Sequence, residues 1–457
     1  MNRGHRMNEG GQRRGGRRGK LAASLLHQLI LFGQHRKPNT KTGSKLIFPP
    51  WPQTKRHRIM FKELLALVGV AAAASLPRNS DMAAAAFARD APLSKILMSN
   101  GSNLLLADFD GAKFNIVFQK KVPIEATWLA YARPDRLYAV DENGKTSTLF
   151  GIDVAGNKME MKATTQASSG VVHLALSKTG NRMVGAGYGA SSIDVYDTSD
   201  GELKFLKSIN STGYQPQQKQ QKAHPHQAVL DPKGRFFIVN DLGMNEILLL
   251  DSSGDSFEII NRVPVEPAGC GPRHGAFFPA GAAEPTHYIV LCETKNLVNV
   301  YSLRYVGGKG IQFRREQSLS TFPSGDVPAK AAAGELAVAP DNRNVYVSNR
   351  LSGATDSVAN FRVVAQSANA SSSDCTHTAA AIRLELVGLT STGGTLPRMF
   401  SFANDGQTLL VGNQGGDLAV VALKRNQDGT LAEKPVASIA SSAFPGGKGP
   451  AYIQQIA

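Results

Sequence analysis

With 457 residues, 42% of them hydrophobic, the chain is long enough to bury a large core, as one big domain or as two or three smaller ones. A formal net charge of +15 would ordinarily indicate a nucleic-acid partner, but residues 1–60 hold 14 Lys and Arg against one acidic residue. The other 397 residues carry a net charge of only +2, which argues against nucleic-acid binding by the main body of the chain.

Two segments precede the first predicted strand. Residues 1–59 are basic and low in complexity, so we interpret them as a disordered extension or as upstream sequence outside the expressed protein; the alternative is a basic arm that binds RNA or DNA. Residues 60–77 form a signal-peptide pattern, with a short charged region after Met60 and an apolar run at 64–74 that is too short to span a membrane. We expect a secreted protein if translation starts at Met60, and a cytoplasmic one otherwise.

A repeat occupies the rest of the chain. Its unit is an apolar strand, a turn containing Pro, Asp or Gly, and a second apolar strand that ends in a polar residue, as in HPHQAVLDPKGRFFIVNDLG. The six units begin 45 to 63 residues apart, at Ala126, Val171, His224, Pro272, Gly334 and Pro397. A further apolar segment follows each pair, which makes three or four strands per unit. Repeats of this length built from short strands indicate a β-propeller, whose blades bury their faces against each other.

The two chain ends supply the parts of a seventh unit. GPAYIQQIA at 449–457 reads as a first strand cut short, and SKILMSNGSNLLLADFDGAKFNIVFQ at 94–119 reads as the strands that this unit lacks. Joining both ends in one blade would leave no exposed sheet edge. We therefore predict an all-β, seven-bladed β-propeller over residues 92–457, closed by N- and C-terminal strands in one blade. A two-sheet sandwich does not explain the six-fold recurrence.

The turn of each unit defines equivalent positions. In the unit that opens at His224, His226 lies eight residues before the turn centre Gly234 and Leu242 eight after it, so we expect the two side by side at the open end of the hairpin. Applied to every unit, with an adjustment for a shorter turn in the first unit and for a few extra residues in the unit that holds Glu293, this rule gives Trp128, Val172, His226, Arg273, Gly334 and Arg398 before the turn, and Glu142, Tyr188, Leu242, Glu293, Arg350 and Gln414 after it. We expect all of them to ring one end of the central channel.

Ionisable side chains at strand ends that face a shared cavity are typical of a binding site. Arg273 and Arg350 suit a carboxylate, a phosphate or a developing oxyanion, and Glu293 and His226 are candidates to move a proton or orient water. The residues that we predict to bind substrate are Trp128, Glu142, Tyr188, Arg398 and Gln414. The alternative is that these groups are solvated blade ends that form ordinary ion pairs.

Other chemistries find less support in the sequence. His224 and His226 flank Pro225, and no Asp, Glu or Cys set completes a ligand shell, so we predict no metal and no cofactor. There is no G-x-S-x-G elbow for a serine nucleophile. The three cysteines, Cys270, Cys292 and Cys375, lack metal-type spacing and allow at most one disulfide.

The same motifs resemble the seven-bladed propeller lactonases, which include the bacterial-type 6-phosphogluconolactonases and the fungal 3-carboxy-cis,cis-muconate lactonising enzymes. The resemblance rests on HPHQAVLDPKGRFFIVNDLG, GPRHGAFFP with YIVLCE, ELAVAPDNRNVYVSNR, PRMFSFANDGQTLLVGNQ and WLAYARPDRLYAVDENG. It implies that His226, Arg273, Glu293 and Arg350 form the active site. Cys292 departs from the family, which commonly has Asn there.

These observations predict a metal-independent lactonase that hydrolyses a sugar lactone or a carboxylated lactone. One alternative is a cycloisomerase that closes a muconate to a lactone at the same site, since this is nearly the reverse chemistry. Another is a secreted propeller that binds a ligand without turnover, because the fold alone does not define a function. The expected partner is a small anionic lactone or muconate, with neither nucleic acid nor membrane.

Overall fold

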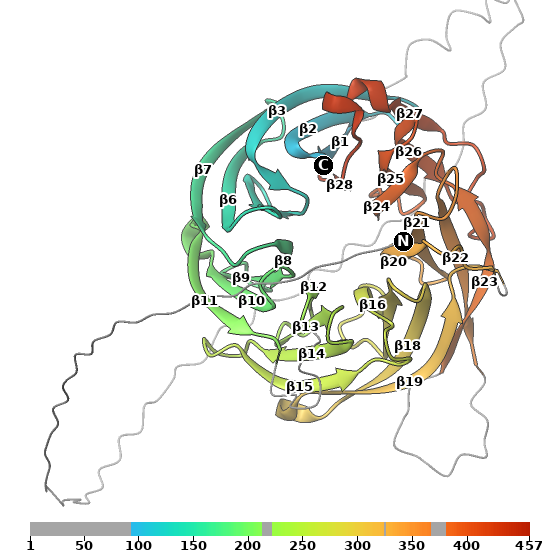
Figure 1. Ribbon diagram of the computed structural model, residues 1–457. Coiled ribbons are helices and arrows are strands. Elements are labelled where there is room, and N and C mark those ends of the chain that lie inside the picture. The colour runs from blue at the N-terminus through green and yellow to red at the C-terminus, as the bar shows by residue number, and fades with distance from the viewer. Residues whose placement is uncertain (1–92, 213–221, 324–325, 367–380) are drawn as a thin grey trace, which may run out of the picture. The chain divides into compact units, whose positions relative to one another are not determined.

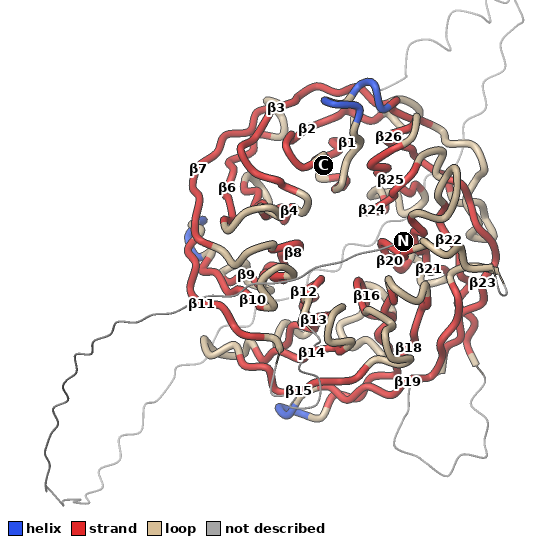
Figure 2. Tube along the Cα trace, in the orientation of Figure 1, coloured by secondary structure: helices blue, strands red, loops and turns tan. Residues whose placement is uncertain are grey.

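The computed structural model describes residues 93–212, 222–323, 326–366 and 381–457. Our predictions for residues 1–59 and 60–77 lie outside these ranges. In the described part, 28 strands form seven four-stranded antiparallel sheets arranged in a ring (Figure 1), and the axis of this ring is called the channel below. Figure 2 shows that strands account for nearly all of the regular structure. The helical elements there are short 3-10 turns, namely η1 (Ser199–Gly201), η2 (Gly307–Lys309), η3 (Ser441–Ala443) and η4 (Pro445–Gly447).

Each blade runs from an inner strand at the channel to an outer strand at the rim. The first three blades in chain order contain β4 (Leu129–Ala132), β5 (Arg136–Val140), β6 (Thr146–Asp153) and β7 (Lys158–Gln166); β8 (Val171–Leu176), β9 (Arg182–Gly187), β10 (Ser192–Asp197) and β11 (Lys204–Asn210); and β12 (Pro225–Leu230), β13 (Phe236–Asp241), β14 (Glu246–Asp251) and β15 (Glu258–Pro264).

The next three blades contain β16 (Pro272–Phe278), β17 (His287–Cys292), β18 (Leu297–Tyr305) and β19 (Ile311–Ser320); β20 (Ala332–Val338), β21 (Asn344–Arg350), β22 (Ser357–Ala365) and β23 (Ile382–Ser391); and β24 (Thr395–Phe402), β25 (Thr408–Gly415), β26 (Leu418–Lys424) and β27 (Ala437–Ala440). The blade that closes the ring contains β28 (Tyr452–Gln455), β1 (Ser94–Ser99), β2 (Gly101–Phe109) and β3 (Phe114–Ala126).

The closing blade joins the two ends of the propeller. β28 is its inner strand and pairs antiparallel with β1, with Ile96 opposite Gln455 and Ser99 opposite Tyr452. This pairing confirms the predicted seven-bladed fold and its closure by N- and C-terminal strands. Each sheet keeps one inner and one outer edge strand, and completing the seventh blade lets neighbouring blades cover the faces of every sheet.

The core lies between the blades. Strands such as β14 and β17 are buried almost throughout because a neighbouring blade covers each face of their sheet, and this explains their continuous apolar sequences. In one interface, Ile247 and Leu249 of β14 pack with Tyr288 and Val290 of β17.

A β-bulge recurs at the start of the inner strands. The pairing register shifts between Val171 and His173, Pro225 and Gln227, Pro272 and Gly275, Ala333 and Leu336, and Pro397 and Met399. The bulged residues are Val172, His226, Arg273 with His274, Gly334 with Glu335, and Arg398. Because a bulge bends its strand and re-aims a side chain, these positions are suited to face the channel.

The bulges correct one expectation from the sequence. Residues at equal offsets from the turn are not direct cross-strand partners, because the extra residue shifts the pairing. The N–H of Leu242 donates to the carbonyl of His224 at 3.0 Å, and the N–H of Glu293 donates to that of Gly271 at 2.8 Å.

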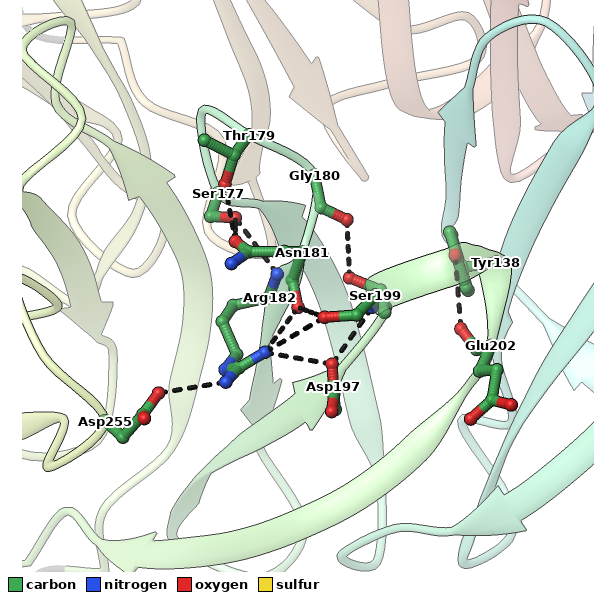
Figure 3. Close-up of polar contacts among 11 residues, drawn as sticks. Tyr138, Ser177, Thr179, Gly180, Asn181, Arg182, Asp197, Ser199, Glu202 and Asp255 are labelled. Atoms are coloured by element: carbon green, nitrogen blue, oxygen red, sulfur yellow. Dashed lines mark hydrogen bonds and ion pairs between the residues drawn. The ribbon is translucent and has the colours of Figure 1, made fainter.

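The hairpin turns that follow the inner strands lie at the opposite end of the blades, where polar contacts join neighbouring sheets (Figure 3). Arg182 of β9 donates to Asp197 of its own blade at 2.9 Å and to Asp255 of the next blade at 3.0 Å. The Tyr138 hydroxyl of β5 donates to the Glu202 carbonyl at 3.3 Å. This end of the propeller thus has its own arginine–carboxylate pairs, separate from the bulged positions.

Candidate active site

Glu293 is held between two arginines at the channel end where the bulges lie. It follows β17, and its Oε2 atom lies 2.8 Å from Nε of Arg273 and 3.1 Å from Nη2 of Arg350. Among the described residues the Arg273 Nε–H makes no hydrogen bond, so its contact with Glu293 is an ion pair. The arginines are fixed in turn by backbone carbonyls: Arg273 donates to Gly334 at 2.5 Å and Arg350 to Ala333 at 2.9 Å.

Gly334 makes this close approach possible. A Cβ atom at this position would lie 2.6 Å from Oγ of Ser348, 3.0 Å from the carbonyl oxygen of Pro397 and 3.1 Å from Nε of Arg350. Any side chain would therefore displace the arginine or the neighbouring inner strand. The glycine fits the position because the backbone carries the acceptor for Arg273.

A second ion pair lies at the same end. Arg398, in the bulge of β24, donates to Oε2 of Glu142 at 2.7 Å, and the hydroxyl of Thr127 donates to the same oxygen. The carboxylates of Glu293 and Glu142 retain 27% and 26% exposure, whereas the Arg273 side chain retains only 2%. A ligand that enters from this end therefore meets the carboxylates together with their arginines.

The charge states in the cluster follow from burial and the paired arginines. Burial alone would raise the pKa of Glu293, but Arg273 and then Arg350 outweigh it, so the pKa lies below its usual value and the carboxylate is ionised at neutral pH. Burial also lowers the pKa of Arg273, Arg350 adds to this effect, and Glu293 opposes it. A guanidinium remains protonated at neutral pH even so.

His226 is buried beside these arginines. Burial, followed by the charge of Arg273, places its pKa well below the usual value of 6.5, so the imidazole is neutral at pH 7. Its Nδ1 atom makes no hydrogen bond with the described residues. Its ring lies 5.8 Å from that of Tyr188 and 5.1 Å from that of His274. The imidazole is thus in the form that can accept a proton, although its lowered pKa makes it a weak base in the unliganded site.

The remaining predicted residues differ in their surroundings. Trp128 packs against the ring of His173 at 4.1 Å and that of Tyr452 at 5.4 Å. Tyr188 stacks on His224 at 4.2 Å, and Nδ1 of His224 lies 2.8 Å from the Tyr188 carbonyl. Gln414 is half-buried in β25, and its side chain makes no hydrogen bond with the described residues. Apart from Gln414, each predicted site residue thus contacts another predicted residue or, in the case of Trp128, the rings of His173, His274 and Tyr452. These contacting residues, together with Glu335 of β20, are called the channel cluster.

Three channel residues were missed by the sequence analysis. Nδ1 of His274 lies 2.8 Å from Oε1 of Glu335, and the ring of His173 lies 5.7 Å from that of His274. All three are buried. Each follows directly after a position selected by the turn rule, which takes one residue per unit. Polar residues next to those positions, within otherwise apolar strands, were the signal that could have identified them.

A disulfide joins the segments that carry Arg273 and Glu293. Cys270 and Cys292 are bonded, with 4.9 Å between their Cα atoms, and both are fully buried. Cys292 directly precedes Glu293, and Cys270 lies three residues before Arg273. The disulfide therefore restrains the backbone on both sides of the ion pair.

Within the described ranges, no group of three or more His, Cys, Asp and Glu side chains is arranged to hold a metal ion. No helix in those ranges has the length and apolar character needed to cross a membrane.

The fold and the channel cluster define a class of protein: a seven-bladed propeller with arginines, carboxylates and histidines at one end of its channel. Residues 97–442 match the family described as lactonase, 7-bladed beta-propeller. The chain belongs to this family of propeller lactonases.

Individual relatives agree with this assignment. The chain is 31% identical over 263 residues to an Arthroderma benhamiae protein named "Probable 6-phosphogluconolactonase". This alignment covers 55% of the present chain and 65% of the relative, so the chain spans just under two thirds of that relative. It is 26% identical over 337 residues to an uncharacterized Lactococcus lactis protein, which covers 73% of this chain and 91% of the relative.

Solved structures share the fold. A periplasmic gluconolactonase from Pseudomonas aeruginosa superposes with a TM-score of 0.65 at 23% identity, covering 80% of this chain and 99% of that one. A Bacteroides uniformis protein described as a "putative 6-phosphogluconolactonase" gives a TM-score of 0.64 at 20% identity, covering 80% and 99%. At these identities the likeness concerns the fold alone.

Proposed function

We propose that the protein hydrolyses a small anionic lactone, either a sugar lactone or a carboxylated lactone, at the end of the channel that carries the bulges. The observation that carries this proposal is the placement of Glu293 between Arg273 and Arg350, beside the neutral, buried His226. Family membership and the names of relatives support lactone chemistry.

The chemistry needs a base, a stabiliser of negative charge and a proton donor. Water adds to the lactone carbonyl carbon, and the carbonyl oxygen becomes an oxyanion that a guanidinium of Arg273 or Arg350 stabilises. His226 takes a proton from the attacking water and returns it to the ring oxygen as the carbon–oxygen bond of the ring breaks. Glu293, ionised between the arginines, keeps them in place and orients the water.

The charge of the site favours an anionic substrate. Three arginines, Arg273, Arg350 and Arg398, face two partly exposed carboxylates, Glu142 and Glu293, so one positive charge is left over. A phosphate or carboxylate on the lactone would complete the charge balance and bind a guanidinium in bidentate fashion. Trp128 and Tyr188 supply aromatic surface for the sugar or diene.

We also propose that the protein acts outside the cytosol. The signal-peptide pattern at 60–77 supports export, and so does the buried Cys270–Cys292 disulfide, because disulfides persist in oxidising compartments.

Turnover of the full-length protein on three substrates tests the function: 6-phosphogluconolactone, uncharged gluconolactone and 3-carboxy-cis,cis-muconate. We expect hydrolysis of the phosphorylated lactone above the spontaneous rate, and its loss in Arg273→Ala and Glu293→Gln. Conversion of the muconate alone would indicate a cycloisomerase instead. If no substrate reacts, or if both variants keep full turnover, the hydrolytic proposal is wrong.

A further inference from the structure

A second titratable pair lies next to the arginine–glutamate cluster, deeper in the protein. His274 follows Arg273 in the bulge of β16, and Glu335 follows Gly334 in the bulge of β20. Nδ1 of His274 lies 2.8 Å from Oε1 of Glu335, which also accepts a hydrogen bond from the N–H of Leu336 at 2.9 Å. The side chains of His274 and Glu335 are only 2% and 7% exposed. A contact between adjacent blades thus fixes the histidine ring.

The pair leaves polar atoms unsatisfied near His226. Nε2 of His274, Oε2 of Glu335 and Nδ1 of His226 make no hydrogen bond with the described residues. The rings of His274 and His226 are 5.1 Å apart and inclined at 65°. Buried polar atoms without partners are uncommon in folded proteins and call for an explanation. A shared role in holding and moving a proton provides one.

We propose that Glu335 and His274 are positioning residues for His226 in the lactonase reaction. Glu335 engages Nδ1 of His274 and thereby fixes its tautomer, which leaves Nε2 as the only ring nitrogen of His274 available to its neighbours. His274, packed against His226, then determines which nitrogen of His226 is free to take the proton. This inference rests on the hydrolytic function proposed above, and it adds two residues to the four that the family resemblance implies.

The electrostatics of the channel agree with this role. Burial raises the pKa of Glu335 to about 8 and lowers that of His274 well below its usual value, so both groups resist charging at neutral pH. The titratable and charged groups that face the pair from the surrounding strands are His173, His226, Arg273, Glu293, Arg350, Arg398 and Tyr452. At neutral pH the uncharged pair therefore adds no further positive charge next to His226.

Kinetics of Glu335→Leu test the inference against a structural role. The substitution roughly keeps the size of the side chain but removes the oxygen that engages Nδ1 of His274. We expect kcat for the hydrolysed lactone to fall at least tenfold with KM within twofold, and the pH profile of kcat to move. Glu335→Gln, which resembles the uncharged carboxyl group in size and hydrogen bonding, should keep most of the wild-type kcat at pH 7. His287→Asn is the matched control, because His287 is buried at the end of β17 away from Glu293, and it should keep the wild-type pH profile. A Glu335→Leu variant with lowered stability but wild-type kcat and pH profile would overturn the proposal, as would an identical effect of His287→Asn.

A second measurement does not depend on turnover. In full-length protein labelled with ¹⁵N-histidine, NMR reports the tautomer and the protonation of each ring. We expect the His226 signals to shift to a different tautomer population or apparent pKa in Glu335→Leu. Unchanged His226 signals would refute the coupling whether or not a lactone is hydrolysed. Shifted signals in a protein that hydrolyses no lactone would support the coupling and refute the hydrolytic function.

Discussion

The guanidinium of Arg398 lies 2.7 Å from the carboxylate of Glu142, although 256 positions separate the two residues in the sequence. Their blades are not neighbours in the ring, because the closing blade of β28, β1, β2 and β3 lies between them. The pair therefore spans part of the channel end, where both side chains are partly exposed. An anionic ligand that reaches this point competes with Glu142 for Arg398.

This competition makes Arg398 a test of substrate charge. We expect Arg398→Gln to raise KM for 6-phosphogluconolactone about tenfold, the equivalent of roughly 1.4 kcal/mol, because one charge-assisted contact with the substrate is lost. KM for uncharged gluconolactone should change less than twofold. Steady-state kinetics on both lactones measure the difference, with Glu142→Gln, which frees Arg398, as the companion variant. Equal effects on both substrates would remove Arg398 from recognition of the anion.

Removal of the disulfide should affect both the stability of the protein and the neighbouring ion pair of Arg273 and Glu293. Replacing Cys270 and Cys292 by serine removes a cross-link between residues 22 positions apart, which should lower the free energy of unfolding by about 3 kcal/mol. Because the disulfide also restrains the segments that carry Arg273 and Glu293, kcat/KM should fall in the protein that remains folded. Urea unfolding and kinetics check both effects, and urea unfolding of the wild type in dithiothreitol, which reduces the bond once the chain unfolds, should show the same loss of stability. A double variant with wild-type stability would show that the disulfide does not form in solution.

Stability should depend on pH with a maximum near pH 6.5. The pKa values of His173, His226 and His274 lie well below 6.5 in the folded protein, so the unfolded chain binds more protons below that pH and stability falls with acid. The pKa of Glu335 is raised from 4.5 to about 8, so its contribution is complete below pH 4.5 and is lost as the pH rises through 8. Each unmatched proton changes the unfolding free energy by about 1.4 kcal/mol per pH unit.

Urea titrations from pH 5 to pH 9 measure this curve. Glu335→Gln should remove the decline between pH 6.5 and 8 while leaving the acid side in place. The assignment of these charge states would be wrong if the wild type gained stability steadily up to pH 8.

The location proposal predicts where the natural protein begins. If residues 60–77 act as a signal peptide, N-terminal sequencing of protein from the culture medium should find a start after Ala74. Protein recovered only from cells, with a start within residues 1–59, would contradict export.

The fold was predictable because the repeat can be recognised from short sequence patterns. Each blade needs an apolar pair of strands around a turn, and the same pattern at Pro272 and Pro397 is visible without any contact information. Closure was also visible, because the fragment at 449–457 lacks the strands that 94–119 provides, and β28 does pair with β1.

The site was only partly predictable, since a turn-based offset counts residues and cannot detect a bulge. His226 and Arg273 were found because they stand at the counted offset, whereas His274 and Glu335 lie in the same kind of bulge one residue beyond that offset. The Arg398–Glu142 pair joins non-adjacent blades, and a local pattern carries no information about such a partner. The bond between Cys270 and Cys292 likewise required their distance, because spacing alone left the pairing open.

The central claim, that the arginine-lined channel end hydrolyses an anionic lactone, is tested most directly by comparing two arginine variants. Arg350 contacts Glu293 in the channel, and Arg182 contacts Asp197 and Asp255 at the opposite end (Figure 3). We predict that Arg350→Gln lowers kcat/KM for 6-phosphogluconolactone at least a hundredfold, measured by acid release above the spontaneous rate, and that Arg182→Gln stays within twofold of the wild type. A wild-type kcat/KM in Arg350→Gln, or an equal loss in both variants, would contradict the claim.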